Sequence, residues 1–348
     1  MKALTFHGPE TLRVESVPDP VVEAPTDVLV RVELTAICGS DLHVYHGREV
    51  GQDPGTTMGH EFLGEIVEVG SAVSSFAAGD VVVSPFSTSC GACFFCERGL
   101  TARCESGAVY GWVSDGVGLQ GAQAEYVRVP LADSTLVRAP ADLPRELVLL
   151  AGDVLSTGFF CAESGGVGPG CTVAVLGCGP VGLMAVLAAR ELGAERVLAI
   201  DSIPERLALA ERFGAVSVDF SAVDPLEVVR AETAGRGADV VLEVVGSPVA
   251  TRLAVDIARV GGTISAAGVH TEPTFAFSPV EAYDKNLTYT AGRCSARRYV
   301  ERVLEVVRER RVDLGELVSH RLPLAEGVRG YEVFDRKLEG CTKVLLAP

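Results

Sequence analysis

The stretch Leu176-Gly-Cys-Gly-Pro-Val-Gly182 decides the fold of this chain. Before it, Thr172–Val175 alternates and ends in a β-branched residue, which is typical of a buried strand, and Leu183–Leu192 after it has the small-residue face of a helix. The three glycines therefore lie on a strand-to-helix turn with G-x-G-x-x-G spacing. Such a turn lets a pyrophosphate approach the backbone, and the free N–H groups at the helix start face the phosphates. The stretch predicts a dinucleotide-binding unit.

The next strand strengthens this interpretation. Arg196–Ile200 ends in Asp201, an acid placed to accept hydrogen bonds from an adenosine ribose. The alternative is a glycine-rich turn with an N-cap acid nearby, but strand, turn, helix, strand and acid follow in the required order. Asp201 favours NAD over NADP, because its charge would face a 2′-phosphate. Arg206 could soften that choice, although we expect it to pair with an acid on its own helix. The predicted cofactor residues here are Gly177, Gly179, Pro180, Val181, Gly182, Asp201 and Arg206, with Val245 and Val269 further along.

Composition limits the class of protein. The chain has 348 residues, of which 48% are hydrophobic and 22% charged, so it is globular and long enough for two cores. A net charge of −16 repels phosphate backbones and anionic lipid, so we expect neither nucleic acid nor membrane as a partner. Met1–Pro9 has one lysine and no long apolar region, which predicts no signal peptide and a cytoplasmic protein.

The order of elements predicts two domains, one interrupting the other. Residues 1 to about 140 show short strands between Gly, Pro and Asp, as in a barrel-like antiparallel domain. Strands and helices then alternate, which implies a doubly wound parallel sheet whose last strand is Leu287–Thr290. We expect a helix over Ala296–Arg311 and a tail that returns to the first domain. The predicted domains are residues 1–152 with 291–348, and residues 153–290.

Four of the ten cysteines cluster in a short loop, at about residues 88–106. Their spacing, C-x2-C-x2-C-x7-C, can turn four thiolates onto one tetrahedral Zn²⁺, and four protein ligands leave no open position. The site would therefore be structural and would order a loop without a core of its own. The alternatives are four free thiols, or disulfides under oxidation. The predicted ligands are Cys90, Cys93, Cys96 and Cys104.

A second set of ligand-type residues is spread along the chain. Cys38 follows a strand, and His60 lies in a glycine-rich turn before another. Asp153 is an acid in an otherwise uncharged helical stretch, where a carboxylate needs a partner. Three such ligands would leave one zinc position open, as in a catalytic site. Taken singly, Cys38 is more often a small buried hydrophobe, and His60 a hydrogen-bonded loop histidine.

These motifs together resemble the zinc-containing medium-chain alcohol dehydrogenases over nearly the whole length. The matching segments are Met1-Lys-Ala-Leu4, Cys38-Gly-Ser-Asp-Leu-His43, Gly59-His-Glu61, Gly79-Asp-Val81, the four-cysteine lobe, Ala124-Glu-Tyr126 and the glycine turn. The resemblance implies an α/β protein with a GroES-like catalytic domain, a Rossmann domain and an active site between them. The Asp153 region looks like that of the branch that contains formaldehyde dehydrogenase.

The resemblance also assigns roles. Cys38 and His60 match ligands of the catalytic zinc, and the third ligand position falls on Asp153. The remaining matches are Glu61 near the metal, Ser40 taking the proton of the substrate alcohol, His43 passing it outward, Thr157 near the nicotinamide and Lys343 at the cofactor pyrophosphate. There are two departures. Gly39 stands where some relatives have an arginine, and aspartate is shorter than glutamate, so Asp153 reaches the metal only if its backbone comes close.

The resulting hypothesis is a homodimeric or homotetrameric enzyme that transfers a hydride between an alcohol and NAD, with aldehyde or ketone as substrate in reverse. It would hold two zinc ions per chain, one catalytic and one structural. The alternatives are a polyol dehydrogenase or a formaldehyde-adduct dehydrogenase. An alternative of another class is a non-catalytic, NAD-binding redox sensor on this scaffold. That alternative predicts missing ligands, whereas Cys38, Ser40, His43, His60 and Asp153 are all present.

Overall fold

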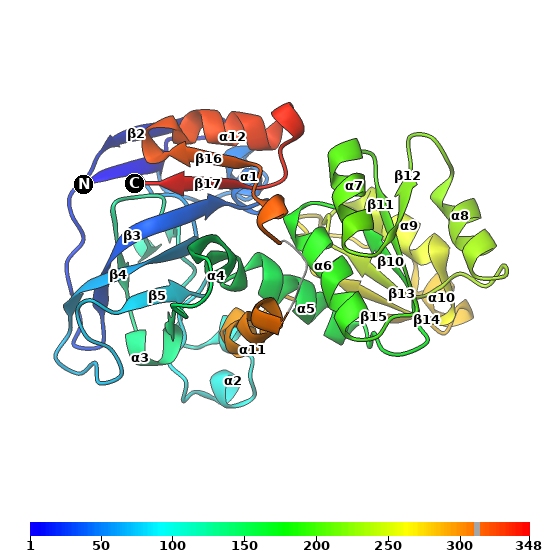
Figure 1. The fold of residues 1–348 in the computed structure, drawn as a ribbon, viewed down its shortest axis with the longest axis horizontal. Helices are drawn as coiled ribbons and strands as arrows, with labels where there is room; N and C mark the ends of the chain where they lie inside the picture. The colour runs from blue at the N-terminus through cyan, green and yellow to red at the C-terminus, as the bar shows by residue number, and fades with distance from the viewer. Residues whose placement is uncertain (310–313) are drawn as a thin grey trace. The chain divides into compact units, whose positions relative to one another are not determined.

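The computed structural model describes residues 1–309 and 314–348, which form two compact units. The β-rich unit comprises Met1–Ser156 and Ser295–Pro348, and the parallel-sheet unit comprises Thr157–Cys294. One unit thus interrupts the other in sequence, and both chain termini belong to the β-rich unit (Figure 1). Each boundary lies four residues after the predicted one, at 156 against 152 and at 294 against 290.

The parallel-sheet unit is a doubly wound sheet, as predicted. Its strand order is β12-β11-β10-β13-β14-β15, and all neighbouring strands run parallel. Helices α6 and α7 pack on one face of the sheet, and α8 and α9 on the other (Figure 1). The strand order reverses between β10 and β13, and the crevice at this point is where such sheets bind ligands. The elements are β10 Thr172–Leu176, α6 Pro180–Glu191, β11 Arg196–Asp201, α7 Pro204–Arg212, β12 Val216–Asp219, α8 Pro225–Glu232, β13 Ala238–Glu243, α9 Pro248–Ile257, β14 Ala258–Ala266, α10 Pro279–Asp284 and β15 Thr288–Ala291.

Local chemistry explains where the helices of this unit begin. All five helices from α6 to α10 start with a proline, whose fixed φ and missing N–H suit the first helical position. Asp224, Ser247 and Ser278 cap three of them through side-chain oxygens that accept backbone N–H bonds. Strand β12 was not predicted, because it is short and only one of its residues, Val218, is buried. Strand β13 was predicted to extend to Val245, whereas it ends at Glu243.

The β-rich unit is built on a mainly antiparallel sheet with the order β16-β17-β3-β4-β5-β9, in which β8 also pairs with β3. The predicted return of the tail is correct, because β17 runs antiparallel to β3 and α12 packs on β16 and β17 (Figure 1). The main elements are β3 Val28–Ile37, α1 Asp41–Tyr45, β4 Glu61–Val69, β5 Val81–Ser84, β8 Tyr126–Val129, β9 Val137–Arg138, α4 Arg145–Ala151, α11 Ala296–Glu309, β16 His320–Pro323, α12 Gly327–Asp335 and β17 Val344–Ala347. Helix α5 Val154–Ser164 begins in this unit, and its residues from Thr157 onward belong to the parallel-sheet unit. The last two residues of the predicted helix Ala296–Arg311 lie outside the described residues.

Helices α4 and α5 come from the stretch predicted to be helical, but they are separate and bent by 41° at Gly152 and Asp153. Within the described residues, no single helix is long and apolar enough to cross a membrane. By length and composition alone, this bent pair passes the same test.

Candidate functional site

Four side chains of the β-rich unit converge on one point. Strand register brings the first pair together, because Ala36 pairs with Glu61 and the end of β3 therefore lies beside the start of β4. Cys38 follows β3 directly, and His60 immediately precedes β4. Asp153 joins them from the break between α4 and α5. The candidate ligand atoms of Cys38, His60, Glu61 and Asp153 all lie within 4.8 Å of one another, and all four residues are buried.

The bend at Gly152 brings Asp153 to this point. A side chain on Gly152 would collide with the backbone oxygen of Ser84 in β5, so only glycine lets the junction approach the sheet this closely. The Asp153 carboxylate lies 3.2 Å from His60 Nε2 and 3.5 Å from the Cys38 sulfur. The short side chain of aspartate is therefore long enough here.

The chemistry of this set suits a divalent metal. Burial, followed by the charges of Asp153 and Glu61, raises the pKa of the Cys38 thiol to about 11. One oxygen of Glu61, Oε2, is buried without a hydrogen-bond partner among the described residues. Several potential anions this close together are costly unless a cation compensates them. Thiolate, imidazole and carboxylate are the ligands of zinc, so these residues fit that ion.

Asp41, which the sequence analysis did not assign a role, orients His60. Its Oδ1 lies 3.1 Å from His60 Nδ1, and its Oδ2 accepts the backbone N–H of Cys38 at 2.9 Å. A carboxylate on Nδ1 keeps the proton there and leaves Nε2 for a metal. Burial lowers the pKa of His60, but the charge of Asp41 and the bonds to both carboxylates outweigh it and raise the pKa well above its usual value. The sequence does indicate this role, because Asp41 is an acid within the Cys38–His43 motif, which also contains the predicted site residues Ser40 and His43.

Lys343 requires a correction. We expected it to contact a cofactor pyrophosphate, but it is fully buried and its Nζ bonds Glu61 Oε1 at 2.6 Å and the Ile37 backbone oxygen at 3.0 Å. Burial opposes its charge, yet the Glu61 carboxylate raises the pKa of Lys343. The side chain therefore neutralises Glu61 and is not available to a phosphate.

Of the two residues predicted to move a proton, Ser40 lies beside the candidate ligands. The Ser40 hydroxyl is 3.4 Å from His60 Nε2, the nitrogen that faces Asp153. His43 lies on α1, and its side chain is partly exposed. Ser40 is thus close to the candidate ligands.

The four cysteines of the lobe also come together. Their sulfur atoms lie within 4.8 Å of one another, and the Cys104 sulfur accepts the backbone N–H of Cys90 at 3.2 Å. Backbone N–H groups of Glu105 and then Cys96 lower the pKa of the Cys93 thiol to about 6. Burial, by contrast, raises the pKa of Cys96 to about 12 and also raises that of Cys104. Four sulfur atoms this close together fit a closed zinc site, in which the cation would stabilise the thiolates.

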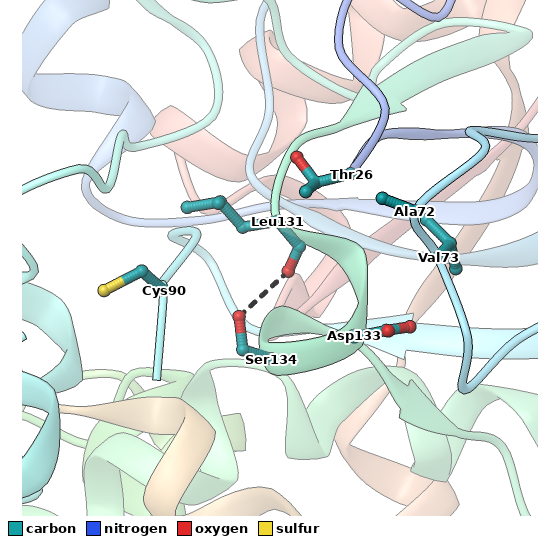
Figure 2. A pocket seen from close by; sticks show the side chains of 7 residues that line it. All are labelled: Thr26, Ala72, Val73, Cys90, Leu131, Asp133 and Ser134. Atoms are coloured by element: carbon teal, nitrogen blue, oxygen red, sulfur yellow. Dashed lines mark hydrogen bonds between the residues drawn. The ribbon is translucent and has the colours of Figure 1, made fainter. Parts of the chain in front are cut away.

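A cavity of about 290 Å³ lies beside Cys90, at the edge of this lobe (Figure 2). None of the residues predicted for catalysis or cofactor binding lines it. Its wall is held by ordinary structural bonds, such as that from the Ser134 hydroxyl to the Leu131 oxygen at 3.2 Å. The cavity therefore differs from the predicted substrate site. Its lining residues are Thr26, Ala72, Val73, Cys90, Leu131, Asp133 and Ser134.

In the parallel-sheet unit, the glycine turn and its expected partners lie together at the carboxyl ends of the strands. Asp201 Oδ2 accepts the N–H of Cys178 at 2.6 Å, and its Oδ1 accepts the N–H groups of Ser202 and Ile203. The acid at the end of β11 therefore holds the turn in place, and Oδ2 retains a lone pair for another donor. Val245 packs against Gly177, whose added Cβ would lie 2.6 Å from the valine.

Arg206 differs from expectation. We expected it to pair with an acid on its helix, but its Nε is buried without a hydrogen-bond partner in the described part of the chain. Its guanidinium lies 3.7 Å from the position of a Cβ on Gly179, at the start of α6. A cation at this turn is suited to a phosphate-bearing ligand.

Glu243 is a second residue that the sequence analysis missed. It is fully buried at the end of β13, and its Oε1 accepts the N–H groups of Val245 and Gly246 at 2.8 Å each. Its Oε2 lies 2.9 Å from His270 Nε2. Glu243 therefore joins the loop that contains Val245 to the loop that contains Val269. Of the remaining predicted residues, Thr157 is buried in α5, and Val181 and Pro180 begin α6.

Comparison with known proteins identifies relatives of the whole chain. Residues 24–141 match the family model of the alcohol dehydrogenase GroES-like domain, and residues 180–309 match that of zinc-binding dehydrogenases. Zinc-type alcohol dehydrogenase B of Aspergillus flavus is 42% identical over 345 residues, covering 96% of this chain and 79% of the relative. The structure of alcohol dehydrogenase TADH from Thermus sp. ATN1 superposes with a TM-score of 0.93 at 44% identity, covering 100% and 99% of the two chains.

One more distant relative is a formaldehyde dehydrogenase. The glutathione-independent formaldehyde dehydrogenase of Pseudomonas aeruginosa is 32% identical over 381 residues, covering 96% of this chain and 94% of the relative.

Proposed function

Because the chain belongs to the zinc-type alcohol dehydrogenase family, we propose that it is an NAD-dependent dehydrogenase that oxidises an alcohol to an aldehyde or ketone. The observation that carries this proposal is the buried set of Cys38, His60 and Asp153 with the Ser40 hydroxyl beside it. Three protein ligands leave one position for a substrate oxygen, which a closed structural site does not. A non-catalytic sensor would not need such an open site.

In this proposal Cys38, His60 and Asp153 hold the catalytic zinc. Glu61 lies beside the site and remains paired with Lys343. When bound, zinc acts as a Lewis acid that lowers the pKa of an alcohol hydroxyl, and NAD accepts the hydride. The chain's own residues move the proton. Ser40 accepts it from the substrate, and His43 passes it to solvent. Asp41 keeps His60 in the tautomer that can serve as a ligand.

We propose that the four-cysteine lobe holds a second, structural zinc ion. The short cysteine spacing and the N–H groups that stabilise thiolate at Cys93 support this. Five of the ten cysteines stand in the two candidate metal sites, and cysteines used as metal ligands fit the reducing cytoplasm better than an oxidising compartment.

NAD is the proposed cofactor. Asp201 supports it, because a carboxylate beside the adenosine ribose would repel a 2′-phosphate. Arg206 acts in the opposite direction, since its buried Nε offers an unused donor near the same turn. We therefore propose a preference for NAD, with some use of NADP.

We also propose that copies of the chain associate through β15, as a homodimer or homotetramer. This strand is the last in the sheet, and edge strands pair readily with another copy. The preceding helix α10 exposes Val280 and Tyr283, and Tyr283 is 82% exposed. Multi-angle light scattering of the wild type and of Tyr283→Lys tests this, because a stable dimer predicts twice the chain mass and a shift toward monomer in the variant.

The test of the activity is NADH formation by zinc-replete protein with primary alcohols, secondary alcohols, polyols and formaldehyde, the last with and without glutathione. Turnover with an alcohol supports the proposal. Turnover with formaldehyde that does not require glutathione would favour a second function, as in the formaldehyde dehydrogenase relative. If no substrate gives NADH and the protein carries only one zinc ion per chain, the proposed catalytic site is refuted.

A further inference from the structure

We propose that Gln123 and Tyr331 are positioning residues for the ligand His60, and that they act on it through Asp41. The inference rests on the proposed catalytic metal site. It adds two residues that lie far from the ligands in sequence, one of them on the C-terminal helix α12.

The contacts form a continuous chain of buried groups. The Tyr331 hydroxyl donates to Gln123 Oε1 at 3.0 Å. Gln123 Nε2 donates to the Ala36 backbone oxygen at 3.0 Å and lies 3.4 Å from Asp41 Oδ2. Asp41 then reaches His60 Nδ1 at 3.1 Å through its other oxygen. Gln123 is fully buried, and Tyr331 is 1% exposed, so water does not compete for these bonds.

The donors and acceptors of this chain permit only one orientation. The Ala36 oxygen and the Asp41 carboxylate both accept, so the amide nitrogen of Gln123 must face them. Its oxygen then faces Tyr331, which must donate. Burial, together with the charge of Asp41, raises the pKa of Tyr331 well above its usual value, so the hydroxyl keeps its proton. Asp41 accepts from Gln123 and from the Cys38 N–H on one oxygen, which leaves the other for His60.

Packing couples the same glutamine to the ligand's own backbone. An added Cβ on Gly59 would collide with the side chain of Gln123, so the space beside the residue before His60 is taken by this glutamine. The backbone N–H of Gln123 also bonds the Met58 oxygen at 2.8 Å. Gln123 therefore contacts the loop of His60 from one side and Asp41 from the other. Losing its bonds would loosen the imidazole without removing any ligand.

The experiment measures zinc retained per chain against increasing chelator concentration, by mass spectrometry of the metal. Wild type should lose zinc in two steps, and the step missing in His60→Ala belongs to the catalytic site. We expect Tyr331→Phe and Gln123→Met each to shift that step to a chelator concentration about two- to tenfold lower. This is the loss of zinc affinity expected when one hydrogen bond of the network is removed. The step of the cysteine lobe should not move, which makes it an internal control for general unfolding.

Two further variants separate positioning from packing. Tyr110→Phe also removes a buried phenol oxygen, here bonded to the Ser84 hydroxyl at 3.2 Å, and should leave the catalytic step in place. In the Gln123→Met background, Tyr331→Phe should cost less than it does alone, because part of its effect on Asp41 is transmitted through Gln123. The inference fails if the catalytic step does not move, if both steps move together, or if Tyr110→Phe has the same effect. If His60→Ala removes no step, the proposed function fails first.

Discussion

Lys343 Nζ lies 2.6 Å from Glu61 Oε1, and both side chains are fully buried. The two residues lie 282 positions apart in the chain, the lysine just before β17 and the glutamate at the start of β4. Glu61 is part of the buried ligand set. Burial raises the pKa of Glu61, and the charge of Lys343 opposes this shift by favouring the ionised carboxylate. We infer that the pair stabilises the β-rich unit.

Replacing Lys343 with methionine should destabilise the protein by about 3–5 kcal/mol, because it leaves a buried carboxylate without its partner. Urea unfolding measures the loss. The matched control is Arg31→Met, whose exposed pair with Glu65 has the same 2.6 Å length and should cost less than about 1 kcal/mol. Equal effects of the two variants would contradict the structural role of Lys343.

Each metal site should be removable by itself. Cys93→Ser should lower the zinc content by one ion per chain and lower the melting temperature, because the lobe has no core of its own. Cys38→Ser should remove the other ion and abolish turnover with a smaller change in melting temperature. Elemental analysis measures the zinc content of both variants, and calorimetry measures their melting temperatures. Loss of both ions in either variant would argue against independent sites.

The hydroxyl of Ser40 should be essential for proton transfer. We expect Ser40→Ala to reduce kcat by about 10²- to 10⁴-fold, whereas Ser40→Thr keeps the hydroxyl and most of the activity. Metal content should stay unchanged in both variants, because the hydroxyl is not a ligand. An alanine variant as active as the threonine variant would show that another group takes the proton.

Asp201→Asn should weaken discrimination against NADP. The change keeps the size of the side chain but removes the charge that would repel a 2′-phosphate, and we expect the ratio of kcat/KM for NADP to that for NAD to rise at least about tenfold. Adding Arg206→Leu should reverse the gain if the free Nε serves the phosphate. A wild type whose kcat/KM for NADP equals or exceeds that for NAD would refute the proposed preference.

Gly152→Ala should weaken the catalytic metal site. The new methyl group would meet the Ser84 backbone oxygen and push Asp153 away from Cys38 and His60. We expect zinc to leave this site at lower chelator concentrations, with the cysteine lobe unaffected. Gly168→Ala is the control, because nothing lies within 4 Å of its added Cβ. If Gly152→Ala retains zinc as well as Gly168→Ala does, the backbone accommodates the added methyl group without displacing Asp153.

The features that the sequence alone determined are local ones. The turn at Gly177–Gly182 and the lobe at Cys90–Cys104 depend on spacing within one loop, and proline starts and capping residues depend on their immediate neighbours. The alternation of elements was sufficient to predict the parallel sheet and the interrupted domain, because right-handed crossovers leave few other arrangements. The resemblance then supplied the roles of Cys38 and His60.

The tertiary structure decided everything that joins distant segments. Lys343 has the charge expected of a phosphate ligand, and only the register of β17 on β3 shows that it lies beside Glu61 instead. Asp41, Gln123 and Tyr331 likewise become one network only after folding, since their spacing along the chain has no period. A buried polar group must find a partner, and the chain fold decides which partner is within reach.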